Sequence, residues 1–169
     1  METMDVIATA DLMDEYLDAI VLPPVFNHFG GVQIFHGPVV TVDCAEDNSK
    51  VKALLESNGL CPETDEPQVL LVNGQGSLNC ALLGDMIAKK AVMNQWAGVI
   101  IDGCVRDASI LKNLSIGIMA LASTPRKSVR QDRGQINPKD FQMRGYQIQA
   151  GCYAYADSDG IVIVPEAVH

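Results

Sequence analysis

Hydrophobic and polar positions in the middle of the chain alternate between short apolar runs and amphipathic segments. Residues 69–72, 98–101 and 116–121 are almost continuously apolar and have the length of buried strands. Between these runs, residues 85–94 carry apolar side chains at helical spacing, and residues 107–113 have the length of a short helix. This order predicts a central βαβαβ segment in which parallel strands are covered by helices.

Two further helices are predicted before the central segment. Residues 9–20 have apolar side chains at helical spacing and start at Thr9, a suitable N-cap residue. Residues 48–58 predict a second helix, capped by Asp47 or Asn48 and stopped by the glycine that follows.

The remaining apolar segments predict strands that flank the central unit. Residues 32–44 are expected to be extended, with an interruption at Gly37-Pro38. Short antiparallel strands are predicted near the C-terminus, with a hairpin turn at Asp157-Ser158-Asp159-Gly160, at residues 146–148, 152–155 and 161–164. No internal repeat and no domain boundary is visible, so residues 1–169 are expected to form one domain.

The overall charge narrows the class of partner. The chain has 12 Lys and Arg against 21 Asp and Glu, which gives a net charge of −9 and a pI of about 4.6. Phosphate groups bind to positive surfaces, so we expect no direct nucleic-acid partner and no membrane partner. A basic protein partner, or a local basic pocket for a small anion, stays open.

The cysteines and the start of the chain bear on its compartment. Five cysteines are scattered without a CxxC pair, which is typical of reduced thiols rather than of a disulfide framework or a zinc site. Residues 1–5 are acidic and lack the basic start of a signal peptide. No apolar run approaches the roughly 18 residues that span a bilayer. We therefore expect a cytoplasmic protein.

The candidate chemistry is concentrated between Gly84 and Asp107. Asp85 begins a predicted helix, and Gly84 before it lets a ligand approach the free N–H groups of Gly84, Asp85 and Met86. Twenty residues later, Arg106 and Asp107 follow an apolar strand, where open parallel sheets bind their ligands. Two simpler interpretations stay open, in which Asp85 only caps its helix and Arg106-Asp107 forms a strand-end salt bridge and a helix cap.

The chemistry of these side chains suits a small anion and a hard cation. The guanidinium of Arg106 offers a fork that matches a carboxylate. Magnesium often takes only one or two protein carboxylates and fills its other positions with water and substrate, so a sparse metal site at Asp107 stays open.

Other candidates have simpler explanations. Gly74-Gln75-Gly76 suggests a nucleotide loop, but Asn79 stands where a GxGxxG motif needs glycine, so a plain turn is the better interpretation. Lys89 and Lys90 are interpreted as solvated side chains rather than Schiff-base amines. The histidines His28, His36 and His169 lack metal spacing, and Cys104 is interpreted as a buried thiol. A basic cluster either recruits an anionic ligand or partner, or is a solvated loop: Arg126, Lys127, Arg130 and Arg133.

An ordered set of fragments over residues 5–165 resembles the RraA-like family, which includes regulators of ribonuclease E activity and 4-hydroxy-4-methyl-2-oxoglutarate aldolases. The fragments are Phe29-Gly30-Gly31, Gly37-Pro38-Val39-Val40-Thr41-Val42, Glu46-Asp47-Asn48, Leu83-Gly84-Asp85, Gly103-Cys104-Val105-Arg106-Asp107, Gly117-Ile118-Met119-Ala120-Leu121-Ala122 and Tyr155-Ala156-Asp157-Ser158-Asp159-Gly160. The resemblance implies an α/β fold, a compact β/β/α sandwich like the swivelling phosphohistidine domain. It also implies homotrimers or dimers of trimers, with sites at subunit interfaces.

The resemblance further implies a metal-dependent (class II type) aldolase that releases pyruvate from 4-hydroxy-2-oxo acids. Aldolase members carry an Asp, twenty residues and Arg-Asp, the register of Asp85, Arg106 and Asp107, whereas regulators without aldolase activity tend to lack one acid. Members usually have an acid where this chain has Ile110.

The implied mechanism gives each of these residues a role. Asp107 is expected to hold Mg²⁺ or Mn²⁺, and Arg106 to bind the carboxylate of an α-keto acid, helped by N–H groups from Gly84 to Met86. Asp85 positions the base that takes the proton of the 4-hydroxyl. Loss of CO₂ from oxaloacetate at the same site is expected, because it gives the same enolate. The alternative is a non-catalytic regulator that binds a ribonuclease.

Overall fold

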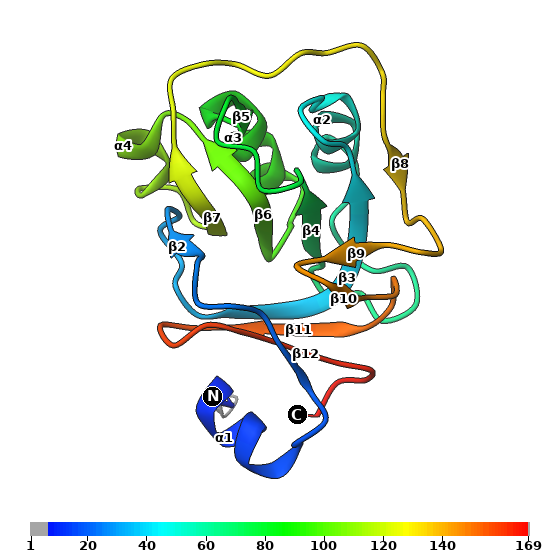
Figure 1. Ribbon diagram of the computed structural model, residues 1–169. Coiled ribbons are helices and arrows are strands. Elements are labelled where there is room, and N and C mark those ends of the chain that lie inside the picture. The colour runs from blue at the N-terminus through cyan, green and yellow to red at the C-terminus, as the bar shows by residue number, and fades with distance from the viewer. Residues whose placement is uncertain (1–6, 169) are drawn as a thin grey trace.

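The computed structural model describes residues 7–168, so the expectations about the acidic start at residues 1–5 and about His169 lie outside the described residues. One curled sheet dominates the described part (Figure 1). Its strands, in spatial order, are β1 (Ile20–Val21), β12 (Ile161–Val164), β11 (Tyr153–Ala156), β3 (Phe35–Asp43), β4 (Val69–Asn73), β6 (Gly98–Val105), β7 (Gly117–Ser123) and β2 (Asn27–His28).

The central βαβαβ segment is confirmed. Strands β3, β4, β6 and β7 run parallel, with Leu70 opposite Val99 and Val99 opposite Ile118. Helices cover the upper face of these strands in Figure 1: α2 (Ser49–Leu55), α3 (Asp85–Met93) and α4 (Ala108–Leu111). Apolar side chains from both layers form a buried core. The carboxyl ends of parallel strands therefore lie along one edge, where ligands bind in such sheets.

The expected antiparallel flank is confirmed as well. Strand β11 pairs antiparallel with β3 and β12, and the β11–β12 turn lies at residues 157–160, with the Asp157 N–H donating to the Gly160 carbonyl. Helix α1 (Thr9–Glu15) packs on the outer face of this flank, around Leu12. The sheet thus folds over itself and encloses a second core that includes Phe35 and Phe141.

The predicted interruption at Gly37-Pro38 is wrong, because β3 runs through it without a break. Residues 35–38 pair with β11, whereas residues 39–43 pair with β4. The Gly-Pro pair marks the place where the strand changes partners.

Both predicted N-terminal helices are shorter than expected. Helix α1 ends at Glu15, because Ile20 joins β1 and pairs with Ile163 in β12. Thr9 is the first residue of the helix rather than its N-cap, and its N–H and hydroxyl donate to the Asp157 carboxylate at 2.8 and 2.7 Å. Helix α2 spans Ser49–Leu55, and Asn48 at its N-cap position makes no capping bond.

Several short strands had no counterpart in the sequence pattern, and one of them shapes the site. Strand β5 (Ala81–Leu83) lies parallel to β6, with Leu83 opposite Val105. The Arg106 N–H donates to the Leu83 carbonyl at 2.9 Å, which aligns the start of α3 with the end of β6. Strands β8 (Gln135–Ile136) and β9 (Gln142–Met143) were not predicted either. The strand predicted at residues 146–148 is confirmed as β10 (Tyr146–Gln147), which pairs with β9 in a separate two-stranded sheet.

Helices in the described part of the chain are all too short or too polar to cross a membrane. The likeness to the swivelling phosphohistidine domain and the assignment of residues 1–169 to one domain stay predictions.

Candidate active site

The residues predicted to form the site line one open cleft of about 650 Å³. Gly84, Asp85 and Met86 come from the start of α3, and Arg106 and Asp107 come from the end of β6. The strand pairing of β5 with β6 brings these two chain segments together. The cleft has the size of a small-molecule site.

A hydrogen bond from the main chain of one acid to the side chain of the other joins the two acids of the cleft. The Asp85 N–H donates to Oδ2 of Asp107 at 3.0 Å. Asp107 has a left-handed backbone conformation, with φ of 59°, which an aspartate tolerates better than most residues. Asp107 precedes α4 but forms no capping bond there, and the N-cap of α3 is Gly84. Neither carboxylate therefore makes an N-cap bond to its own helix, although the Asp85 carboxylate accepts a bond from the Met86 N–H in the first turn of α3.

Gly84 lets the two segments approach closely. A Cβ atom at this position would lie 2.8 Å from Oδ2 of Asp107 and 3.3 Å from Cγ and Nε of Arg106. The space beside the Gly84 backbone is already filled by the two side chains of the Arg-Asp pair, so any larger residue must displace them.

The charge on Asp85 is stabilised by its surroundings. Partial burial raises the pKa of this carboxyl, but the hydrogen bonds that it accepts from the Lys89 ammonium and the Met86 N–H lower it by more, so the net shift is downward. The Lys89 ammonium lies 3.3 Å from Oδ2 of Asp85. Lys90 pairs instead with Glu56, the residue that directly follows α2. Both lysines are about half exposed, and Lys89 contributes to the charge balance of the cleft.

The guanidinium of Arg106 has no ion-pair partner among residues 7–168. The interpretation of Arg106 as half of a strand-end salt bridge is therefore wrong for the described part of the chain. The Asp85 and Met86 N–H groups already donate to carboxylates, so Arg106 is the stronger anion-binding group on this wall.

A basic segment that crosses the top of the molecule also lines the cleft. Residues 124–134 connect β7 to β8, and we call them the strap (Figure 1). Lys127 and Arg130 of the strap line the cleft, whereas Arg126 and Arg133 do not. The structure thus divides the basic cluster of the sequence into two residues that face the site and two that do not.

Asp47 and Asn48 position the strap, and sequence reasoning assigned them only to helix capping. The buried Asp47 carboxylate accepts hydrogen bonds from Ser49 N–H at 2.9 Å and Gln131 N–H at 2.7 Å. Asn48 Oδ1 accepts a bond from Nε of Arg130 at 3.1 Å. The signal in the sequence was the Glu46-Asp47-Asn48 fragment of the family resemblance.

The donor set of the cleft suits a hard cation with few protein ligands. Among the described residues no group of three or more His, Cys, Asp or Glu side chains is arranged to hold a metal ion. Asp85 and Asp107 nevertheless supply neighbouring carboxylates in an open polar cleft. Such a pair fits Mg²⁺ or Mn²⁺, which complete their coordination with water and substrate oxygens.

The other candidates lie outside this cleft. Gly74-Gln75-Gly76 forms a tight turn after β4, with the Ser77 N–H donating to the Gly74 carbonyl, as expected. The Cys104 thiol is buried, and burial raises its pKa. His28 contacts the Asp157 carbonyl through Nε2, and His36 stacks on Tyr153 in the antiparallel flank.

Comparisons with known proteins agree on one family for this chain. The model of the family described as "RraA-like: Aldolase/RraA" matches residues 9–163. A protein of Albidiferax ferrireducens named "Putative 4-hydroxy-4-methyl-2-oxoglutarate aldolase" is 48% identical over 163 residues, covering 92% of this chain and 94% of its own. A protein of the same name from Xanthomonas campestris is 45% identical over 156 residues, covering 92% and 89%.

Solved structures share the fold. The RNA-processing inhibitor RraA from Thermus thermophilis superposes with a TM-score of 0.88 at 39% identity, covering 100% of this chain and 96% of that one. A structure from Geobacillus kaustophilus, described as an S-adenosylmethionine: 2-dimethylmenaquinone methyltransferase, has a TM-score of 0.86 at 39% identity, covering 96% and 97%.

Proposed function

Because the chain belongs to the RraA-like family, we propose that it is a lyase that cleaves 4-hydroxy-2-oxo acids of the 4-hydroxy-4-methyl-2-oxoglutarate type to pyruvate. The observation that carries this proposal is the meeting of Asp85, Arg106 and Asp107 in one cleft. The names of its relatives point to the same aldolase chemistry.

Arg106 binds and orients the substrate. Its guanidinium has no ion-pair partner among the described residues, so it is available to a carboxylate in the fork geometry that planar acids favour. A carboxylate held by Arg106 directs the adjacent 2-oxo group toward the acids, because Asp107 is the next residue and lies against the same Gly84 backbone.

Asp85 handles the proton of the 4-hydroxyl. Its lowered pKa keeps the carboxylate ionised at neutral pH. The carboxylate accepts this proton through one water molecule, and the C3–C4 bond breaks as its electron pair moves onto the pyruvate fragment. The resulting carbonyl fragment leaves, and protonation of C3 completes the formation of pyruvate.

Asp107, with Asp85 beside it, would hold the divalent cation. When bound, Mg²⁺ or Mn²⁺ supplies a Lewis acid for the negative charge of the enolate. Asp107 is kept in place by the Asp85 N–H and by its left-handed backbone. The same enolate arises when oxaloacetate loses CO₂, so oxaloacetate decarboxylation belongs to this proposal. The scheme requires no Schiff base from Lys89 or Lys90.

The direct test is to incubate the purified protein and Mg²⁺ with 4-hydroxy-4-methyl-2-oxoglutarate and, separately, with oxaloacetate. We expect pyruvate from both substrates, measured by chromatography, and no covalent adduct after borohydride treatment with pyruvate. Arg106→Ala is expected to raise KM by about 10- to 100-fold, the range that a lost charge-assisted hydrogen bond gives. Absence of pyruvate from both substrates would refute the activity, and a trapped adduct would refute its metal-assisted form.

A protein-binding role is the second candidate, favoured by the likeness to the Thermus inhibitor and by the net charge of −9. In this role the acidic surface would bind a basic segment of a ribonuclease. Binding that weakens steeply with salt, together with no pyruvate release from any 4-hydroxy-2-oxo acid, would favour this function. The trimeric or hexameric assembly and the cytoplasmic location stay predictions of the family resemblance and of the composition.

A further inference from the structure

A second cavity, of about 570 Å³, lies at the carboxyl ends of β3 and β4, where Cys44 and Gly74 follow the two strands. This volume is within the range of small-molecule sites. Neither Arg106 nor the acids Asp85 and Asp107 line it, so the proposed lyase chemistry gives this cavity no role. We call it the second cavity.

The turn that follows β4 forms one wall of the second cavity. The main-chain N–H groups of Gln75, Gly76 and Ser77 all donate to acceptors of the protein, at 2.9, 3.0 and 3.1 Å. A phosphate-binding loop needs main-chain N–H groups that are free for the ligand. This wall therefore offers its side chains to a ligand, and it is unsuited to a nucleotide phosphate.

Glu46 gives the second cavity a negative charge. Its Oε2 accepts hydrogen bonds from the Ser77 hydroxyl and from Nδ2 of Asn79, at 2.5 and 3.0 Å. These bonds hold the pKa of the Glu46 carboxyl below its ordinary value, so the group is ionised at neutral pH. Glu46 forms no ion pair within residues 7–168. Its carboxylate can therefore accept a further bond from a positively charged group.

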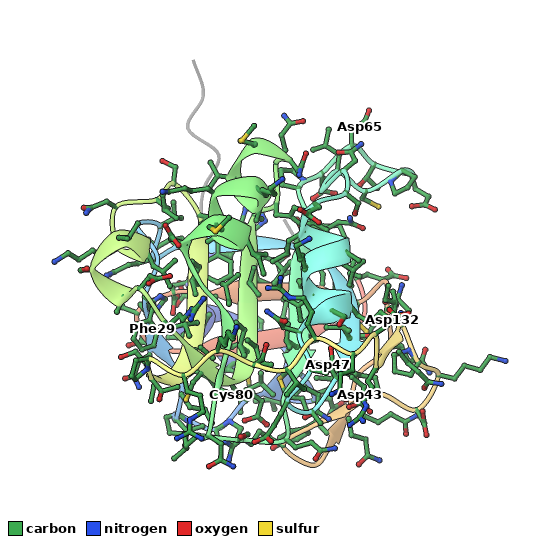
Figure 2. The ribbon with its side chains drawn as sticks, turned by 90° about the horizontal axis from the view of Figure 1, so that it is seen from above. Phe29, Asp43, Asp47, Asp65, Cys80 and Asp132 are labelled. Atoms are coloured by element: carbon green, nitrogen blue, oxygen red, sulfur yellow. The ribbon has the colours of Figure 1, made fainter. Side chains whose placement is uncertain are left out.

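The other acid of the second cavity, Asp47, is already occupied by the protein. It is 2% exposed, and its Oδ2 accepts bonds from the N–H groups of Gln131 and Arg133 at 2.7 and 3.4 Å. Its Oδ1 accepts two bonds from Ser49. Figure 2 shows the strap from above where it passes Asp47. Asp47 thus holds the strap, and Glu46 is the acid that remains for a ligand.

Arg133, in the second half of the strap, gives the second cavity a positive charge. Its side chain is exposed, and its guanidinium forms no ion pair within residues 7–168. Arg133 and Glu46 line the same cavity without pairing with each other. An acid and a base in this arrangement can both be satisfied by one ligand that carries both charges.

The remaining side chains of the second cavity are polar and uncharged. Burial raises the pKa of the Cys44 thiol to about 12, so this group is neutral. Gln75 and Gln131 carry amides, which offer both donors and acceptors of hydrogen bonds. The single free cation does not match a dicarboxylate, and the free acid beside it disfavours a simple anion. The lining matches a small polar ligand with one positive and one negative group.

We propose that the second cavity binds a small zwitterion of the α-amino acid class, with its ammonium group on Glu46 and its carboxylate on Arg133. Charge-assisted hydrogen bonds at both ends would select a ligand that carries both charges over one that carries either alone. Val129 and Gln131 of the strap line this cavity as well as the candidate active site, so the ligand would be an effector rather than a substrate. The inference does not depend on the lyase function.

The test compares L-serine with two analogues that each lack one charge. 3-Hydroxypropanoate lacks the ammonium group, and ethanolamine lacks the carboxylate. Titration of the ¹⁵N-labelled protein, followed by NMR, gives the dissociation constant and identifies the amides that shift. L-serine is expected to shift the amides of Gln75, Ser77 and Arg133. It is expected to bind at least about tenfold more tightly than either analogue, the contribution of one charge-assisted hydrogen bond.

Matched variants assign the two charged contacts. Glu46→Gln removes the charge but keeps the shape of the side chain and an acceptor for Ser77, and Arg133→Gln changes an exposed position. Each is expected to weaken L-serine binding by about 10- to 100-fold. Arg126→Gln removes a charge from a part of the strap that lines neither cavity, so it is expected to keep the wild-type affinity. Arg133→Gln alone decides the outcome if Glu46→Gln fails to fold.

Three results would overturn the inference. They are an absence of shifts at the second cavity with millimolar L-serine, equal affinity for 3-hydroxypropanoate, and an affinity for L-serine that Arg133→Gln leaves unchanged. Shifts confined to the candidate active site, abolished by Arg106→Ala, would also overturn it, because the ligand would then occupy the substrate cleft. Each of these results leaves the lyase function standing, since that function is decided by the release of pyruvate.

Discussion

Gly84 is the residue at which the parts of the site meet. Its backbone lies against Oδ2 of Asp107 and against the side chain of Arg106, at distances that leave no room for a Cβ atom. The next residue, Asp85, donates its N–H to the same carboxylate. Because Gly84 has no side chain, the side chains of Arg106 and Asp107 can lie against the start of α3.

The Gly84→Ala variant tests this packing. The added methyl group must displace Asp107 and Arg106, and displacements of about 1 Å in an active site typically cost up to about 100-fold in rate. We expect kcat/KM for pyruvate release to fall at least about tenfold, with little change in the thermal midpoint of unfolding. Met93→Ala, on an exposed position of the same helix, is the control. Wild-type kinetics for Gly84→Ala would show that the close approach has no catalytic importance.

The residues Asp85, Arg106 and Asp107 of the cleft were predictable from the sequence, but the contacts among them were not. The spacing of Asp85, Arg106 and Asp107 around a strand and a helix indicates that they meet at one edge of a parallel sheet. The bond from the Asp85 N–H to Asp107 depends on the left-handed backbone of Asp107 and on the alignment of β5 with β6. Neither feature leaves a periodic signal in the chain.

At the scale of elements, the strands formed by long apolar runs were predicted well, whereas most strands of two or three residues were not. Strands β4, β6 and β7 each bury consecutive apolar residues, so their type is evident from composition alone. Strands of two or three residues, such as β5 and β8, form because a distant partner is available. Helix α1 ends early for the same reason, since β12 recruits Ile20.

The strap is an element without regular structure of its own, and its position depends on the charge of Asp47. Burial raises the pKa of this carboxyl, but bonds from Ser49, Gln131 and Arg133 lower it by more, to about 2 from the ordinary value of 3.8. Because the pKa is lower in the folded protein, the carboxylate stabilises the fold fully above pH 3.8. That stabilisation is lost as the pH falls through about 2.

The Asp47→Asn variant is therefore expected to differ from the wild type in stability by an amount that depends on pH. At pH 7 its free energy of unfolding is expected to be lower than that of the wild type. The difference is expected to shrink by about 2 kcal/mol as the pH falls from 5 to 2, since each pKa unit corresponds to about 1.4 kcal/mol. Urea unfolding at intervals over this range measures it. A difference that stays constant with pH would contradict the role of the Asp47 charge.

At the scale of the whole molecule, the distribution of charge matters more than its sum. The net charge of −9 indicates an acidic protein, yet the cleft gathers Arg106, Lys127 and Arg130. The curled sheet makes this possible, because it fixes the end of β6 and the top of α2 under one crossing strap (Figure 1). Composition alone predicted no nucleic-acid partner, but only the fold shows where the few cations collect.

The measurement that tests the central claim most directly is the rate of pyruvate release from 4-hydroxy-4-methyl-2-oxoglutarate as a function of Mg²⁺ concentration, for the wild type and Asp107→Asn. We predict saturable activation of the wild type, loss of activity in EDTA, and at least about a tenfold higher Mg²⁺ requirement in the variant, as the loss of a charged ligand implies. Full activity of the wild type in EDTA, or an identical Mg²⁺ dependence of the two proteins, would contradict a metal-assisted site built on Asp107.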